Sequence, residues 1–120
     1  MSRARVEVRT AVAPGPVALG PGTYAQVALT ADGKRVAIVT ESGSGSVAAG
    51  STGTIRVTLG NYGFSKKLAA LGVTGVSVSG GTAYLVGVSA TTDYVDVTVY
   101  NPGTAAVTLT VTVTVALLGV

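Results

Sequence analysis

The chain ends on a run in which valine or leucine alternates with threonine, VTLTVTVTVALLGV, at residues 107–120. Apolar and polar residues that alternate with a period of two predict a β-strand buried on one face. The apolar members that would line the core are Val107, Leu109, Val111, Val113 and Val115. Because strands rise about 3.3 Å per residue and are most often about five or six residues long, we expect this one to bend or to project beyond its partners.

The same run contains no charged residue, although exposed strand edges are normally protected by lysine, proline or bulges. We therefore expect both edges of the terminal strand to be paired or covered. Leu117 and Leu118 then place leucine on both faces of the strand, so we expect this end to lie in a subunit contact. Removal of residues 116–120 should accordingly weaken assembly more than it weakens the monomer fold.

Low charge extends over the whole chain. Among its 120 residues, 48% are hydrophobic and only 11% are charged, against about 25% charged in a typical soluble domain. Small neutral residues, including 17 glycines, take the place of the missing charges. Because neutral surfaces with apolar patches associate readily, the composition predicts one domain whose surface faces other protein subunits over much of its area.

Proline and glycine divide the sequence into an arm, a connector and a domain. The arm, residues 1–13, alternates as a strand does, and the connector, residues 14–23, is stiff and extended because of its prolines. The basic side of the arm consists of Arg3, Arg5 and Arg9. Residues 24–120 are expected to form a single β domain.

Within this domain, Asp-Gly at residues 32–33 predicts a tight hairpin between strands at residues 24–30 and 34–40. Serine and glycine at residues 41–53 predict a flexible loop. One short helix is expected near residues 65–71, capped by Ser65 and ended by Gly72. Further strands are expected at residues 54–59, 73–79, 82–89 and 94–100.

The predicted fold class is therefore all-β, with about eight strands, short turns and at most one helix. Because a sheet must bury one face on another, we expect an antiparallel β-sandwich or a small, jelly-roll-like barrel.

The side-chain chemistry excludes most enzyme classes. The chain has no cysteine and no histidine, so Ser–His triads, Cys–His pairs, disulfides and thiolate or imidazole metal sites cannot form. Asp93 and Asp96 lie three residues apart near a strand, so their side chains should point to opposite faces and form neither a glycosidase pair nor a calcium site. We expect no enzymatic activity, no cofactor and no bound metal.

Basic residues give the chain a formal net charge of +3. Tyr62 and Phe64 beside Lys66 and Lys67 are residue types found in nucleic-acid sites, but the set is small, and a solvated edge explains it as well. An arm that docks on an acidic protein surface explains the arginines equally well. Nucleic acid is therefore disfavoured as a partner.

A membrane is disfavoured too. The long uncharged stretches, residues 68–92 and 97–120, contain too much threonine and glycine for a lipid-exposed helix. The first residues carry charge but no apolar core of a secretory signal.

The segment YNPGT at residues 100–104, followed by valine–threonine alternation, resembles the closing strand of many virion β-modules, and the arm and connector are similar in style to those of capsid decoration proteins. The resemblance is to small all-β bacteriophage virion proteins as a type. It implies a structural protein, made in the host cytoplasm and carried in the virion, that binds a major capsid or other virion protein and forms a homo-oligomer, with a trimer favoured. The residues expected to contact partners are Arg3, Arg5, Arg9, Leu117 and Leu118.

Two other classes remain open. A tail-fibre or spike module could bind a receptor or a carbohydrate by stacking sugars on Tyr62, Tyr84 or Tyr94. A bacterial surface or secreted β-module is disfavoured because no secretory signal is visible.

Overall fold

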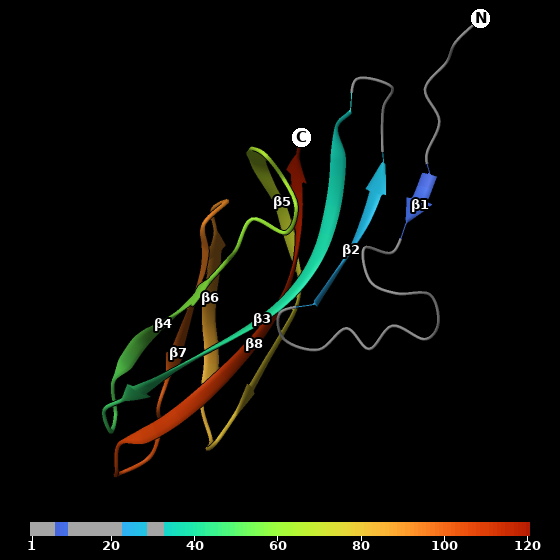
Figure 1. Ribbon diagram of the computed structural model, residues 1–120. Helices are drawn as coiled ribbons and strands as arrows, with labels where there is room; N and C mark the ends of the chain where they lie inside the picture. The colour runs from blue at the N-terminus through green and yellow to red at the C-terminus, as the bar shows by residue number, and fades with distance from the viewer. Residues whose placement is uncertain (1–6, 10–22, 29–32) are drawn as a thin grey trace, which may run out of the picture.

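A computed structural model describes the backbone of residues 7–9, 23–28 and 33–120 and the side chains of residues 33–120. The described residues contain strands and turns and no helix, which confirms the all-β class. The strands are β1 (Glu7–Arg9), β2 (Thr23–Ala28), β3 (Arg35–Val47), β4 (Thr52–Thr58), β5 (Lys67–Ser79), β6 (Tyr84–Ala90), β7 (Tyr94–Tyr100) and β8 (Val107–Gly119) (Figure 1).

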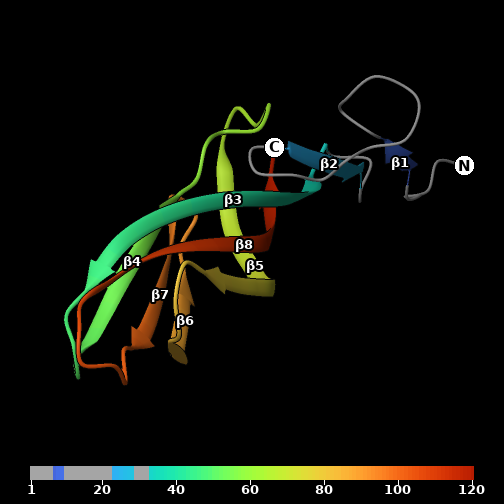
Figure 2. The same cartoon turned by 90° about the horizontal axis from the view of Figure 1, so that it is seen from below.

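Two antiparallel sheets of three strands each make up residues 35–119. The long sheet has the order β3-β8-β5, and β2 and then β1 extend it beyond β3; the short sheet has the order β4-β7-β6. The predicted hairpin between β2 and β3 is confirmed by pairing from Thr23 opposite Thr40 to Ala28 opposite Arg35. The short sheet lies against one half of the long sheet, as the view from below shows (Figure 2).

The terminal strand β8 is the middle strand of the long sheet. It pairs with β3 from Val107 opposite Val47 to Gly119 opposite Arg35, and β5 pairs along its other edge. The prediction that both edges are paired is therefore confirmed. The terminal strand was expected either to bend or to project beyond its partners. It bends, because β3 and β8 curve together along their length (Figure 1).

The core lies between the two sheets and consists mainly of valine. Alternate residues of β8 from Leu109 to Leu117 are fully buried, as are Val95, Val97 and Val99 of β7. The valine face predicted for the terminal run is thus confirmed from Leu109 to Val115, and Val107 packs against the core while partly exposed. The opposite face of β8 carries threonine hydroxyls that bond across to β3, where Thr114 lies 3.1 Å from Thr40 and Thr112 lies 3.1 Å from Ser42.

The loop predicted at residues 41–53 is wrong, because β3 continues to Val47 and only residues 48–51 form the turn into β4. Glycine in this segment serves close packing. A Cβ on Gly43 would lie 2.7 Å from the carbonyl oxygen of Arg56, so only glycine lets β4 pass this close. Serines on the alternate positions face the threonines of β8.

The helix predicted near residues 65–71 is also wrong, because β5 occupies Lys67–Ser79. Two turns of helix are marginal alone, and this segment instead supplies the partner strand for the second edge of β8. Three register shifts leave Leu68, Leu71 and Thr74 without an opposite residue on β8. The segment predicted to be a helix between Ser65 and Gly72 therefore contributes an edge strand interrupted by bulges.

The C-terminal end is built into the monomer. Leu117 is 0% exposed within the core, and Val120 accepts hydrogen bonds from the backbone N–H groups of Ser65 and Lys66 while donating one to the carbonyl of Lys66. These contacts give residues 116–120 a direct part in the monomer fold, and their effect on assembly stays a prediction. The physical reason is that β8 alternates without interruption to its end, so Leu117 continues the buried face.

Candidate interaction surface on the short sheet

The residues predicted to contact partners do not come together in the described structure. Arg3 and Arg5 lie outside the described residues, and of Arg9 only the backbone, in β1, is described. Leu117 is enclosed in the core of its own chain, which removes it as a contact for partners. Leu118 is half-buried on the other face of β8.

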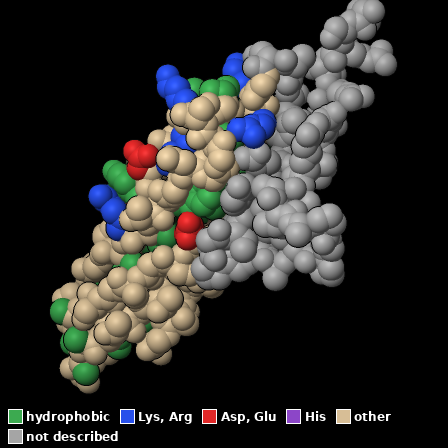
Figure 3. Space-filling view, in the orientation of Figure 1, with side chains coloured by type: hydrophobic (Ala, Val, Ile, Leu, Met, Phe, Trp, Pro, Cys, Tyr) green, Lys and Arg blue, Asp and Glu red, His purple; other side chains and the backbone are tan. Residues whose placement is uncertain are grey.

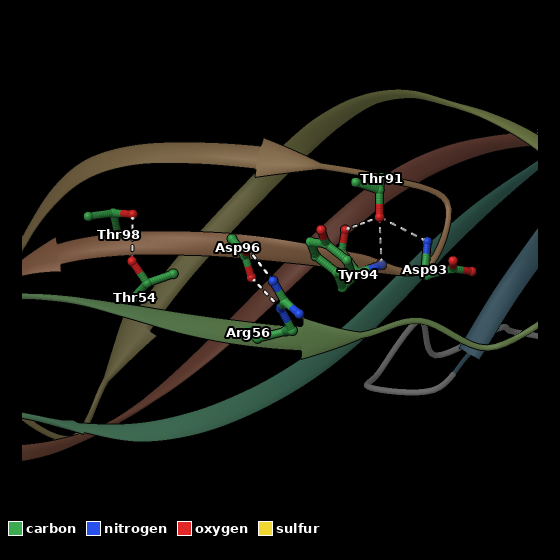
Figure 4. A network of polar contacts seen from close by, with 7 residues as sticks. All are labelled: Thr54, Arg56, Thr91, Asp93, Tyr94, Asp96 and Thr98. Carbon is green, nitrogen blue, oxygen red and sulfur yellow. Dashed lines mark hydrogen bonds and ion pairs between the residues drawn. The ribbon is translucent and has the colours of Figure 1, made fainter.

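The outer face of the short sheet holds a network of polar side chains instead (Figure 4). The register between β4 and β7 places Arg56 opposite Asp96 and Thr54 opposite Thr98. Arg56 donates two hydrogen bonds to the Asp96 carboxylate, at 2.9 and 3.0 Å, and its guanidinium lies 3.6 Å from the centre of the Tyr94 ring. These bonds from Arg56 lower the pKa of Asp96, and the pKa of Arg56 is raised in return.

Asp93, the nearby carboxylate that was not expected to pair with Asp96, has a different partner. Asp93 lies 3.3 Å from the ammonium group of Lys67, at the start of β5, and its backbone N–H is held by the Thr91 hydroxyl (Figure 4). Asp93 and Asp96 thus neutralise separate cations and do not face a common substrate position. A paired carboxylate mechanism has no support at this place.

Exposed apolar side chains gather on β6, at the edge of the same sheet. Tyr84, Leu85 and Val86 are 60%, 54% and 61% exposed, and Val88 is 37% exposed. No described strand pairs with the outer edge of β6. The segment from residue 80 to residue 92 carries no charge, so this edge lacks the usual protection against pairing.

Beyond β6, the described residues at one end of the molecule carry no charge. Residues 42–55, 77–88 and 97–112, which we call the uncharged end, meet there through pairs such as Val47 with Val107 and Tyr84 with Tyr100. On the face shown in Figure 3, lysine, arginine and acidic side chains lie over the other end, and the lower end displays only neutral side chains. Such an asymmetry suits burial against protein rather than contact with water.

The tyrosines proposed for sugar stacking do not form one cluster. Tyr62 is half-buried, Tyr94 lies under the Arg56 guanidinium, and Tyr84 stands in the register opposite Tyr100 at the uncharged end. Phe64 is buried, which leaves no exposed aromatic ring beside Lys66 and Lys67 in the described structure. The aromatic and basic residues there therefore make no stacking platform for nucleic acid.

Tyr62 occupies a strained position that the sequence did not reveal. Tyr62 and Gly63 have φ of 51° and 83°, and the Phe64 N–H donates to the Asn61 carbonyl at 2.9 Å, which defines a type I′ turn. The Tyr62 hydroxyl donates to the carboxylate of Glu41 on β3. Burial, and then this hydrogen bond, raise the pKa of Tyr62 well above its usual range.

Tyr62→Phe is expected to lower the free energy of unfolding by about 1–2 kcal/mol, because it leaves the half-buried Glu41 carboxylate without that donor. Because the pKa of Tyr62 is raised in the folded state, neutral Tyr62 stabilises the fold below about pH 10. This contribution to the free energy of unfolding is lost as the pH rises above that value. Denaturant melts at pH 7 and across the alkaline range measure both effects. The wild-type chain should lose more stability above pH 10 than the variant.

The control for this experiment is Tyr84→Phe, since the Tyr84 ring is 60% exposed. It should leave both the neutral-pH stability and the alkaline loss unchanged within about 0.5 kcal/mol. Equal alkaline losses in wild type and Tyr62→Phe would show that the hydroxyl contributes nothing to the fold.

Comparisons with protein-family models, with curated proteins and with solved structures gave no match to this chain. Among the described residues, no group of three or more acidic side chains is placed to hold a metal ion. The part of the chain that the structure describes also has no helix of the length and hydropathy needed to cross a membrane.

Sequence reasoning missed the Arg56–Asp96–Tyr94 network and the exposure of β6. Arg56 is the one charged residue between Ser42 and Asn61, and Asp96 is the one charged residue of β7. Two single charges of opposite sign, on strands that otherwise have none, indicate a possible ion pair in the sequence. Only the strand register shows that the two residues lie side by side. The uncharged character of β6 was visible in the sequence, whereas its position at an edge was not.

Proposed function

We propose that the chain is a structural protein of a bacteriophage virion, a capsid decoration protein that binds the shell through its N-terminal arm and associates with copies of itself. The two facing sheets then act as a β-sandwich that carries the arm. The chain would be made in the host cytoplasm and would act without a cofactor. Its partners are other copies and the major capsid protein or another virion protein.

The observation that carries this proposal is the uncharged end with its exposed apolar edge strand. A surface that exposes Tyr84, Leu85 and Val86 and has no nearby charge favours permanent contact with protein. β1, the described part of the arm, pairs with β2 at the far side of the long sheet, so in this proposal one molecule offers two different surfaces. Many weak contacts repeated over a shell give a large combined affinity, which is how decoration stabilises a capsid.

The arm supplies the second surface in this proposal. Arg3, Arg5 and Arg9 present three guanidinium groups that bind acidic side chains well, since arginine pairs with carboxylates in a bidentate manner. Leu118 lies half-buried on the outer face of the long sheet and adds a small apolar contact there. Leu117 does not contribute to this surface, because its side chain is buried in the core.

The test uses particles produced by the phage genome that encodes the chain. Mass spectrometry of purified particles should find the chain at a stoichiometry comparable to that of the major shell protein. Particles stripped of the chain should bind it again when it is added back, and replacing Arg3, Arg5 and Arg9 by glutamine should weaken this rebinding at least tenfold. Absence of the chain from purified particles would overturn the proposal.

A second candidate is a tail-fibre or spike module that binds a carbohydrate. The register opposite Tyr100 puts the exposed ring of Tyr84 beside a second tyrosine on one face, and paired rings can stack on sugars. This candidate predicts binding on a glycan array that Tyr84→Ala abolishes and Tyr62→Ala does not. The absence of binding on the glycan array, together with the presence of the chain on phage heads rather than tails, favours the capsid decoration role.

A further inference from the structure

We propose that β6 is the contact between copies: the β6 strand of one molecule pairs antiparallel with the β6 strand of a second across a two-fold axis. The inference rests on the self-association proposed above and names its surface and its symmetry. It joins two short sheets into one continuous sheet of order β4-β7-β6-β6-β7-β4.

The first step compares the edges that the described strands leave open. β4 carries Arg56 in its ion pair with Asp96, and β5 carries Lys67 and three register shifts. At the far side of the long sheet, β1 has Glu7 and Arg9 in its sequence. Charges and bulges are the features that protect edges from pairing. β6 has no charge and a single register shift, between Leu85 and Gly87.

The second step concerns the side of β6 that faces the core. Leu85 and Val88 stand opposite Val99 and Val97 of β7, both of which are 0% exposed. Leu85 and Val88 nevertheless remain 54% and 37% exposed. The core is therefore incompletely covered at this edge, and a further strand in the same sheet would extend the cover over both side chains.

The third step identifies the occupant as a second copy. A strand that pairs here must be apolar and uncharged, and among the described strands β6 itself combines those properties with an open edge. Two identical uncharged strands bring no like charges together, and each supplies the backbone N–H and C=O groups that the other leaves unpaired. Contacts of one surface with itself are two-fold.

This pairing yields a dimer, whereas the resemblance to virion proteins favoured a trimer. A strand ladder joins copies in pairs, and a trimer would require two different edges to meet. The other edges carry charges or bulges, which argues against such a contact.

The first experiment measures mass in solution by sedimentation equilibrium over about 1 μM to 1 mM protein. The wild-type chain should be a dimer that dissociates on dilution. Val86→Lys puts a charge on the edge and should raise the dissociation constant tenfold or more. The matched control is Leu71→Lys, since Leu71 lies on the bulged edge of β5 and is 54% exposed, against 61% for Val86. This control should leave the dimer intact, and circular dichroism should show both variants folded.

The second experiment uses the absence of cysteine from the chain. Single cysteines at Val86 or Ser89 of β6, treated with a short bismaleimide, should give cross-linked dimers in high yield, and a cysteine at Leu71 should not. This readout does not depend on how a lysine affects folding. Equal cross-linking at Leu71 and at β6 would overturn the pairing.

The results separate this inference from the function on which it rests. A monomer at all concentrations, or a trimer that Val86→Lys leaves intact, overturns β6 pairing even if the chain is found in virions. A β6 dimer from a chain absent from purified particles supports the pairing and overturns the decoration role.

Discussion

A chain that ends at Val115 is expected to lose its cooperative fold. The truncation removes Leu117 from the core, the pairing of residues 116–119 with β3 and β5, and the hydrogen bonds between Val120 and the segment before β5. Loss of one buried leucine side chain alone costs about 2–5 kcal/mol, and domains of this size are stable by only about 5–15 kcal/mol. Thermal melts followed by circular dichroism should show no cooperative transition.

Two single substitutions measure separately how much Leu117 and Leu118 contribute to the stability that the truncation removes. Leu117→Ala should lower the free energy of unfolding by about 2–5 kcal/mol because its side chain is 0% exposed. Leu118→Ala, on the half-buried outer face, should cost less than about 1.5 kcal/mol. If the truncated chain melts like the full one, the C-terminal end is no part of the core and Leu117 is free to contact a partner.

Local patterns sufficed for the strands in which alternation is strict. β7 begins at Tyr94 and ends at Tyr100 as predicted, and the inward valines of β8 are those that the sequence designated. Period-two alternation predicts both the strand and the residues that face the core, so neither prediction needs information from other parts of the chain.

The errors fall where a distant strand decides the conformation. Serine and glycine at residues 42–46 have the composition of a loop, yet they form a strand because β8 pairs beside them and β4 crosses close to Gly43. Residues 67–72 have helical propensity, but the open edge of β8 makes pairing more favourable. Propensity is a weak preference that tertiary contacts override.

The candidate interaction surface was predictable only in part. Composition indicated burial against other subunits, and the uncharged stretch around β6 was part of that signal. The order β4-β7-β6 decides that β6 is an edge, and the register decides that Arg56 meets Asp96. Both follow from pairing between segments about 40 residues apart, as the separation of Arg56 from Asp96 illustrates.

Asn101 is the buried polar residue that joins the turn before β8 to the end of β3. Asn101 is 1% exposed, and its side-chain hydrogen bonds go to backbone groups. The amide nitrogen donates to the carbonyls of Val47, at 3.1 Å, and Ala105, at 2.9 Å, and the amide oxygen accepts from the N–H of Gly103 at 2.9 Å. One side chain thus satisfies three backbone groups from two segments.

Asn101→Ala is expected to lower the free energy of unfolding by about 2–4 kcal/mol, because it leaves these backbone groups unsatisfied in or near the core. The matched control is Asn61→Ala in the exposed turn before β5, which should change stability by less than about 0.5 kcal/mol. Denaturant melts at pH 7 give both values. Equal effects of the two alanine variants would mean that the Asn101 bonds do not support the fold.

Asn101→Asp sharpens this test, because it keeps the acceptor for Gly103 but turns a carboxylate oxygen toward the carbonyls of Val47 and Ala105. Burial and the facing carbonyls should raise the pKa of the new carboxyl group in the folded state. A raised pKa makes the folded state more favourable at low pH and less favourable as the pH rises through it. The stability deficit of Asn101→Asp relative to wild type should therefore shrink between pH 7 and pH 4, whereas the deficit of Asn101→Ala should stay constant. A deficit in Asn101→Asp that does not change with pH would show that this side chain is not held against the two carbonyls.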